Sequence, residues 1–288
     1  MTGSVLQGFF TEIFAKQGTS FGLAIRRKLH EEQTRYQYLE VYETESFGNL
    51  LVLDGCIMLS GRDNFLYHEM MVHPAMFTHA NPREVAIIGG GDCGTLREVL
   101  KHDSVERVVQ VEIDEQVTRA AERFFPELTA SNHDTRAQLL FMDGIEWIKT
   151  QPDASLDVIL VDATDPIGPA RELYETDFLS ACQRVLREDG ILVQQSESPL
   201  LHTDSLIQHL HKGMKAAGFA QVRTLLFPQP VYPSGWWSCT LASRLVNLAY
   251  ARQSDIRNKR FPTEYYNLDT HIAAMAVPEF MRRRLEAE

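Results

Sequence analysis

Short apolar runs separated by turn residues characterise the first sixty residues of the chain. The runs cover 38–42, 50–53 and 56–59. Asp54-Gly55 separates the last two runs, and this dipeptide strongly favours a two-residue hairpin turn. Residues 1–61 are therefore predicted to form a small antiparallel β-strand domain.

A different pattern follows, and it opens with a helix predicted over about 62–79 that carries apolar residues such as Phe65 and Met70. Beyond this helix, apolar runs of strand length alternate with helical segments. The predicted strands are 85–88, 108–111, 139–142, 158–161 and 191–195. Because such alternation is typical of βαβ units around a parallel sheet, residues 62–288 are predicted to form an α/β domain.

The composition argues against two classes of protein. The 288 residues include 28 Lys and Arg against 39 Asp and Glu, which gives a formal net charge of −11 at pH 7. A chain this acidic lacks the basic face of a nucleic-acid-binding protein. No stretch approaches the roughly 18 apolar residues of a membrane-spanning helix, and the N-terminus lacks the pattern of a signal peptide. We therefore expect no nucleic-acid partner and no membrane association.

The cysteines are few and scattered along the chain. They are Cys56, Cys93, Cys182 and Cys239. No two of them form a C-x-x-C pair, and no group of cysteines and histidines has the spacing of a zinc site. This usage favours a reducing compartment, so we expect a cytoplasmic protein with no metal site.

A glycine-rich loop follows the first predicted strand of the α/β domain. Gly89, Gly91 and Gly94 match the fingerprint of a dinucleotide-binding loop, and Glu112 ends the next strand, where an acid would hold ribose hydroxyls. Asp92 lies inside the loop, and its carboxylate would repel a pyrophosphate. It suits a nucleoside with an amine or sulfonium, as in S-adenosylmethionine, better than NAD. The alternative is that Asp92 is only a turn or helix-capping residue.

Further carboxylates end the later strands. Asp143-Gly144 follows the third strand, where the aspartate is either a ligand for an adenine amino group or part of an ordinary turn. Asp162 and Asp165 follow the fourth strand and enter a loop rich in proline and glycine. Because the carboxyl ends of parallel strands meet at one edge of a sheet, Asp92 and this pair should converge. Their mutual repulsion favours a substrate that carries ammonium groups, although Asp165 is alternatively a helix cap.

An ordered set of motifs resembles the spermidine synthase (polyamine aminopropyltransferase) family. From about residue 37 to the C-terminus, the matching stretches include Leu53-Asp54-Gly55, Tyr67-His68-Glu69-Met70, Gly89-Gly90-Gly91-Asp92, Val111-Glu112-Ile113-Asp114, Asp143-Gly144, Asp162-Ala163-Thr164-Asp165-Pro166-Ile167-Gly168-Pro169, Tyr232-Pro233-Ser234-Gly235 and Tyr265-Tyr266-Asn267. The resemblance implies a Rossmann-like, methyltransferase-type sheet beside the small N-terminal β domain. It also implies a homodimer or homotetramer.

The resemblance implies a reaction and the residues that perform it. Such enzymes transfer an aminopropyl group from decarboxylated S-adenosylmethionine, a co-substrate and not a bound cofactor, to putrescine, giving spermidine and methylthioadenosine. The implied donor nucleoside site is formed by Gln37, Gly90, Asp92, Glu112, Asp143, Gly144 and Pro169. The implied polyamine site is formed by His68, Asp92, Asp162, Asp165 and Tyr232. Asp162 would accept the proton, and Tyr67 would position the attacking nitrogen.

Several positions depart from the family pattern or stay undecided. Met58 stands where many members have glutamine, and Cys93 stands where glycine is usual. These departures bear on the choice of acceptor, and a longer diamine such as cadaverine is one alternative. Gln195 and Glu197 lie at the end of the fifth strand, and the sequence favours neither a place in the pocket nor one outside it.

Three other functions compete with aminopropyl transfer. Putrescine N-methyltransferase would use S-adenosylmethionine itself, whose extra carboxylate Asp92 would repel. A catalytically silent polyamine-binding protein would be expected to lack Asp162 or Tyr67, and both are present. An NAD-dependent oxidoreductase is disfavoured by Asp92 and by the carboxylate pair after the fourth strand.

Overall fold

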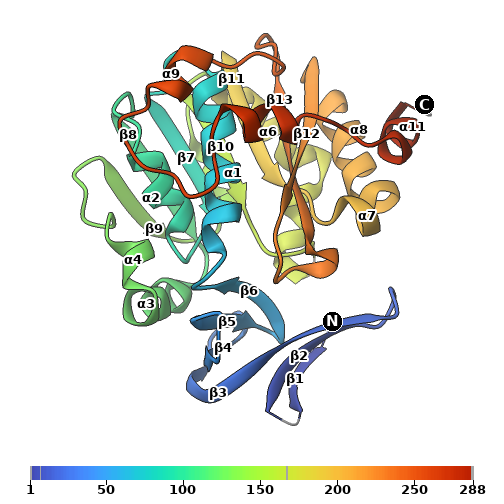
Figure 1. Ribbon diagram of the computed structural model, residues 1–288. Coiled ribbons are helices and arrows are strands. Elements are labelled where there is room, and N and C mark those ends of the chain that lie inside the picture. The colour runs from blue at the N-terminus through green and yellow to red at the C-terminus, as the bar shows by residue number, and fades with distance from the viewer. Residues whose placement is uncertain (1, 7, 167, 287–288) are drawn as a thin grey trace.

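The computed structural model describes residues 2–6, 8–166 and 168–286, and Figure 1 shows them as a small N-terminal sheet below a larger α/β unit. In the described residues the small sheet has six strands that pair in chain order, all antiparallel. They are β1 (Thr2–Leu6), β2 (Phe9–Phe14), β3 (Thr19–Gln33), β4 (Tyr38–Thr44), β5 (Asn49–Leu53) and β6 (Cys56–Ser60). Asp54 and Gly55 have φ angles of +50° and +79°, which suit the predicted hairpin turn between β5 and β6.

The larger sheet has seven strands in the described residues, in the order β12-β13-β11-β10-β7-β8-β9. The strands are β7 (Glu84–Gly89), β8 (Arg107–Glu112), β9 (Ala137–Phe141), β10 (Leu156–Asp162), β11 (Leu186–Gln195), β12 (Gln221–Pro228) and β13 (Trp236–Ser243). β7 to β11 run parallel, as predicted, which confirms the α/β class. In chain order, β8 and β9 lie on one side of β7, and the next strands, β10 and β11, lie on its other side. Ligands of such sheets bind at this point of reversal, beyond the carboxyl ends of the strands.

The two strands at one edge of this sheet, β12 and β13, were not among those predicted from the sequence. β13 pairs antiparallel with both β11 and β12. Residues 229–235 are too short a connection for the crossover that parallel strands need, so β12 and β13 form a hairpin.

Helices cover both faces of the larger sheet (Figure 1). They are α1 (Asn64–Thr78), α2 (Gly94–Leu100), α3 (Glu115–Phe124), α4 (Pro126–Thr129), α5 (Gly144–Thr150), α6 (Thr176–Val185), α7 (Pro199–His202), α8 (Gln208–Ala216), α9 (Gln253–Arg257), α10 (Leu268–Ala274) and α11 (Glu279–Glu286). Further helical segments are η1 (Gly168–Tyr174), η2 (Thr203–Ile207) and η3 (Pro233–Gly235). Within the described chain, no helix has the length and apolar character needed to cross a membrane.

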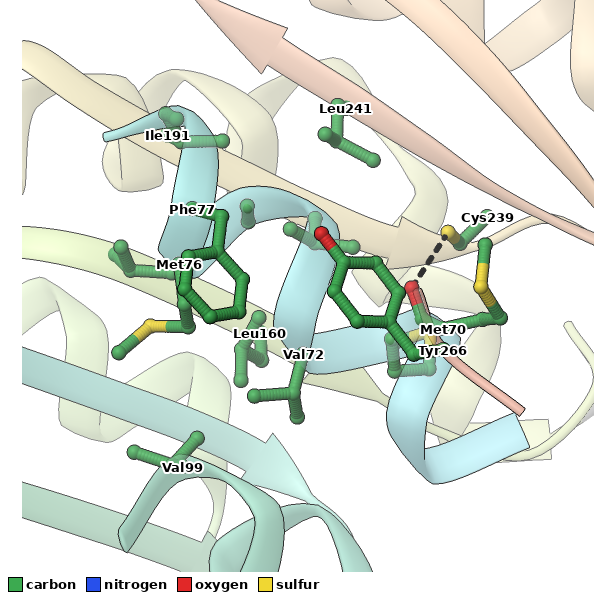
Figure 2. Close-up of a cluster of buried hydrophobic side chains, with 14 of the residues drawn as sticks. Met70, Val72, Met76, Phe77, Val99, Leu160, Ile191, Cys239, Leu241 and Tyr266 are labelled. Carbon is green, nitrogen blue, oxygen red and sulfur yellow. Dashed lines mark hydrogen bonds between the residues drawn. The ribbon is translucent and has the colours of Figure 1, made fainter. Parts of the chain in front are cut away.

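Helix α1 forms the centre of the largest hydrophobic cluster. Figure 2 shows its Met70, Val72, Met76 and Phe77 surrounded by side chains from the sheet and from α2. Nearly every residue of α1 is buried, so it lacks the polar face of an ordinary surface helix. The small sheet is joined to the larger unit through a second cluster, in which its inward side chains pack on α3 and α4. This second contact places the small sheet over the carboxyl ends of β7, β8 and β10.

Candidate active site

A cavity of about 310 Å³ lies between the two sheets. Its floor is formed by the loops that follow β7, β8, β9 and β10, and its roof by the small sheet. Ten of the predicted site residues line it: Gln37, Tyr67, Gly90, Asp92, Glu112, Asp143, Gly144, Asp162, Asp165 and Tyr232. Pro169 belongs to η1, but its side chain lies outside the described part of the structure. The described lining of this cavity does not include His68.

The glycine loop rests directly on the end of β10. Gly89 and Gly90 have φ angles of +84° and +70°, a region that favours glycine. A Cβ on Gly89 would lie 2.2 Å from the carbonyl oxygen of Asp162, and the Gly90 N–H donates to that oxygen at 2.8 Å. Only glycine lets the two segments come this close, and this contact brings the loop alongside the Asp162 side chain.

Asp162 is held by two hydroxyl donors. Tyr67 Oη donates to its Oδ1 at 2.7 Å, and Thr95 Oγ1 donates to its Oδ2 at 2.5 Å. Burial raises the pKa of Asp162 above its usual value and the negative charge of Asp92 raises it further, although the hydrogen bonds from Thr95 and Tyr67 oppose the rise. Burial also raises the pKa of Tyr67 well above its usual value, so its hydroxyl keeps its proton and stays a donor. Asp162 is thus a fixed carboxylate that is more basic than an exposed aspartate.

Asp92 forms an ion pair with His68, whose Nε2 lies 3.1 Å from Asp92 Oδ1. Burial acts to lower the pKa of His68, but the charge of Asp92 outweighs burial and raises it. Burial acts to raise the pKa of Asp92, but His68 and the N–H of Gly94, at 2.6 Å, hold it below its usual value. Asp92 therefore stays ionised while it accepts from the N–H of Gly94, the first residue of α2. His68 lies behind Asp92 and reaches the cavity only through that carboxylate.

The far end of the cavity contains a buried glutamate. The N–H of Asp114 donates to Glu112 Oε1 at 2.8 Å, and Gln37 Nε2 donates to Asp114 Oδ2 at 2.9 Å. Burial raises the pKa of Glu112 to about 7, although the hydrogen bond from the Asp114 N–H opposes the rise. A Cβ on Gly91 would lie 3.0 Å from Glu112 Oε2, so glycine at this position leaves the carboxylate room.

Asp143 and Gly144 border the same end. Asp143 caps α5 by accepting from the N–H groups of Ile145 and Glu146 at 2.8 and 3.4 Å. Both bonds go to Oδ1. A Cβ on Gly144 would lie 2.6 Å from Ile88, so glycine allows α5 to begin close to β7. Because Oδ2 accepts neither of these bonds, Asp143 can cap α5 and bind a ligand at the same time.

A smaller pocket of about 40 Å³ opens beside Tyr67 and Asp165. Its wall is aromatic: the Tyr232 ring lies 6.0 Å from the Tyr67 ring and 4.7 Å from the Trp237 ring. The Tyr232 hydroxyl donates to the Met58 carbonyl, and Trp237 Nε1 is buried with no hydrogen-bond partner among the described residues. The pocket is therefore a flat-walled recess that continues from the Asp162 end of the larger cavity.

Carboxylates surround this recess. Glu12 and Asp165 line the recess. Burial raises the pKa of the nearby Glu197 well above its usual value, and the negative charge of Asp165 raises it further. Burial likewise raises the pKa of Glu12 to about 7 against the opposing Ile57 N–H, which donates at 2.9 Å. Glu197 has a φ of +66°, a conformation that is uncommon outside glycine. Of the two undecided residues, Gln195 lines the recess and Glu197 lies behind Asp165.

Glu12 was not among the predicted site residues, because the sequence pattern did not separate β2 from its neighbouring strands. Phe10, Glu12 and Phe14 share the inward face of β2, while Phe9 and Ile13 point outward. An acid in the buried register of a strand is a usable signal, since such a group needs a partner or a ligand.

Comparisons with known proteins agree on one family. A family model described as spermine/spermidine synthase domain matches residues 64–251, and one described as spermidine synthase tetramerisation domain matches residues 8–61. The chain is 60% identical over 274 residues to the polyamine aminopropyltransferase of Alkalilimnicola ehrlichii, covering 95% of this chain and 96% of that protein. It is 59% identical over 281 residues to that of Nitrosococcus oceani, covering 98% of each. Its fold is similar to a crystal structure of spermidine synthase in complex with the transition-state analogue AdoDATO, with a TM-score of 0.94, 32% identity, and coverage of 99% of this chain and 97% of that one.

The substitution Gly94→Ala tests the packing behind Asp92. Its Cβ would lie 2.1 Å from His68 Cε1, so we expect the buried ring to be displaced and the free energy of unfolding to fall by roughly 1–3 kcal/mol in urea denaturation. Gly61→Ala is the control, because its Cβ would meet no atom nearer than 3.4 Å, and we expect a change below about 0.5 kcal/mol. Equal free energies of unfolding for the two variants would show that the His68 ring can accommodate the added methyl group.

Proposed function

Because the chain belongs to the spermidine synthase family and is a polyamine aminopropyltransferase, we propose that it transfers the aminopropyl group of decarboxylated S-adenosylmethionine to putrescine, giving spermidine and methylthioadenosine. The observation that carries this proposal is the position of Asp162. Asp162 lines the larger cavity and is bonded to Tyr67, which lines both that cavity and the recess, and it has a raised pKa and two hydroxyl donors.

The donor occupies the larger cavity. Glu112 accepts from the ribose hydroxyls, and Gln37 steadies that end through Asp114. Asp143 is placed for the adenine amino group, beside Gly144. Gly90 and Pro169 complete the nucleoside site in this proposal. The complex of the related spermidine synthase with the transition-state analogue AdoDATO supports a donor related to decarboxylated S-adenosylmethionine.

Asp92 selects the form of the donor. Decarboxylated S-adenosylmethionine ends in an ammonium, which Asp92 attracts. S-adenosylmethionine carries an additional carboxylate, which the same side chain repels. The ion pair with His68 keeps Asp92 charged, so His68 contributes to this selection from behind the carboxylate.

The diamine occupies the recess. One nitrogen faces Asp162 and Tyr67, and the distal ammonium lies among Glu12, Asp165 and the aromatic wall of Tyr232. Aromatic faces and carboxylates both attract alkyl ammonium groups. The small volume of the recess, about 40 Å³, favours putrescine over the longer cadaverine. Met58 lines both the larger cavity and the recess.

The chemical step needs a neutral amine. An alkyl ammonium has a pKa near 10.4, so removing its proton at pH 7 costs roughly 4.6 kcal/mol. Asp162 accepts this proton, and its raised pKa reduces the mismatch. The nitrogen lone pair then forms a bond to the carbon next to sulfur, the carbon–sulfur bond breaks, and its electrons neutralise the sulfonium. Tyr67 holds Asp162 in place, and alignment of nitrogen, carbon and sulfur supplies much of the rate.

The small sheet is the proposed contact between subunits. The tetramerisation-domain match covers it, and Val5, Phe9 and Ile13 expose 48%, 48% and 40% of their surface on β1 and β2. Apolar side chains gathered on one hairpin favour association, so we propose a homo-oligomer, either a dimer or a tetramer.

A product assay by mass spectrometry tests the proposed function. Purified protein receives equal amounts of S-adenosylmethionine and its decarboxylated form, with putrescine, cadaverine and spermidine in competition. We expect methylthioadenosine and spermidine. Adenosylhomocysteine with a methylated diamine would instead show a methyltransferase, and nucleoside binding without product would indicate a silent binding protein.

The substitution Asp162→Asn tests the proton acceptor. The amide keeps the size of the side chain but cannot take a proton, so we expect kcat to fall by about 100-fold or more, with methylthioadenosine affinity retained. Asp153→Asn is the control, because its side chain is 76% exposed far from the cavity, and its kcat should equal that of the wild type. Turnover unchanged by Asp162→Asn would remove this carboxylate from the mechanism.

The pH dependence of nucleoside binding tests Glu112. Its pKa is raised to about 7, and the ribose hydroxyls donate to the ionised form, so binding is full above pH 7 and weakens as the pH falls. We expect calorimetry to give a methylthioadenosine Kd about tenfold weaker at pH 6 than at pH 8. Glu112→Gln should bind more weakly but lose this dependence. A wild-type Kd that is flat over this range would contradict the assignment.

A further inference from the structure

Parts of two sequence motifs take no part in the site described so far. Glu69 follows Tyr67 and His68 on α1, and Tyr265-Tyr266-Asn267 lies near the C-terminus. Glu69 is only 1% exposed, and the described linings of both cavities leave it out. A buried carboxylate needs strong partners to remain in a folded protein, so its contacts indicate its role.

Glu69 binds the backbone of this second motif. Its Oε1 accepts from the N–H of Glu264 at 2.7 Å, and its Oε2 accepts from the N–H groups of Tyr265 and Tyr266 at 2.9 and 2.7 Å. Three charge-assisted bonds to successive backbone groups hold a segment in one position.

This segment is part of a C-terminal strap, residues 252–271, which leaves the sheet after β13 and returns across α1 (Figure 1). At its first end Arg252 donates to the carbonyls of Met76 and His79, at 2.9 Å each, and so caps the end of α1. Between the ends, Tyr266 stacks on Phe77 with ring centroids 5.8 Å apart, and Figure 2 shows it beside Met70 and Phe77. The strap thus contacts α1 near both of its ends and between them.

Helix α1 needs such contacts because it is buried almost all round. Apolar packing is non-directional, so it sets the rotation of a helix with no polar face only weakly. Hydrogen bonds are directional, and Tyr67 and Glu69 make them from the same turn of α1. Tyr67 bonds to Asp162 and Glu69 bonds to the strap, while His68 between them forms an ion pair with Asp92.

We propose that Glu69 is a positioning residue for aminopropyl transfer: by binding the strap, it fixes the rotation of α1 and so sets the Tyr67 hydroxyl and the His68 ring on the two carboxylates of the cavity. This inference rests on the roles proposed above for Tyr67 and His68.

Glu69→Gln removes the effect with little change of shape. An amide has one acceptor oxygen, and its NH₂ group would face N–H donors, so at least one of the three bonds is lost. We expect kcat to fall about tenfold, while the methylthioadenosine Kd changes less than about twofold, since the nucleoside end is built on other elements. In a Tyr67→Phe background the same substitution should lower kcat by only about twofold, because the Tyr67 hydroxyl that Glu69 positions is already absent.

Tyr266→Phe is the matched control within the strap. It removes the hydrogen bond between Tyr266 Oη and His271 Nδ1, 2.7 Å long, and leaves the three N–H groups on Glu69. We expect a lower Tm with wild-type kcat. The proposal would be overturned if kcat fell in proportion to Tm in both variants. It would also be overturned if Glu69→Gln lowered kcat equally in the wild-type and Tyr67→Phe backgrounds. If the glutamine variant does not fold, Glu69→Asp serves for the same comparison.

Hydrogen exchange separates this proposal from the proposed function. Glu69→Gln should accelerate exchange of the amides in the first half of α1, and Tyr266→Phe should not. This readout is independent of turnover. Absence of aminopropyl transfer by the wild-type protein would reject the proposed function, whereas unchanged exchange in α1 would reject the positioning role of Glu69.

Discussion

The approach of the glycine loop to the carbonyl oxygen of Asp162 is the contact on which the rest of the site depends. It joins the ends of β7 and β10 at the point where the sheet reverses its direction of growth. The loop can then turn Asp92 toward the cavity while α2 starts immediately behind it. A side chain on Gly89 would move the two carboxylates apart, and the charge of Asp92 adds to the rise that burial causes in the pKa of Asp162.

Negative charge is concentrated around the two cavities, and each carboxylate is compensated differently. Asp92 has a histidine, Asp162 has two hydroxyls, and Glu112 has a backbone N–H as well as a raised pKa. These partners are enough for the folded chain but leave acceptor capacity facing the cavity. Cationic reactants complete the compensation, so the proposed substrates should stabilise the fold as well as react in it.

The sequence predicted the parts of the molecule that follow local rules. The Asp54-Gly55 hairpin and the run of parallel strands were confirmed, as were the α/β class and the family resemblance. The antiparallel β12–β13 hairpin was not foreseen, because a buried strand has the same apolar pattern in either direction. Individual roles of the site residues stay predictions. The position of His68 behind Asp92, and the contact between Glu69 and the strap, depend on how distant segments pack, which spacing along the chain does not encode.

The alternation along β2 has a consequence for how the N-terminal sheet can evolve. Glu12 faces the recess while its neighbour Ile13 faces outward, because successive side chains of a strand point to opposite sides. A shift of one residue in the pairing of β2 with β3 would exchange the two, burying an isoleucine in the recess and turning the acid outward. A shift of two residues would preserve the pattern. Changes in this register among descendants of the chain should therefore come in even steps.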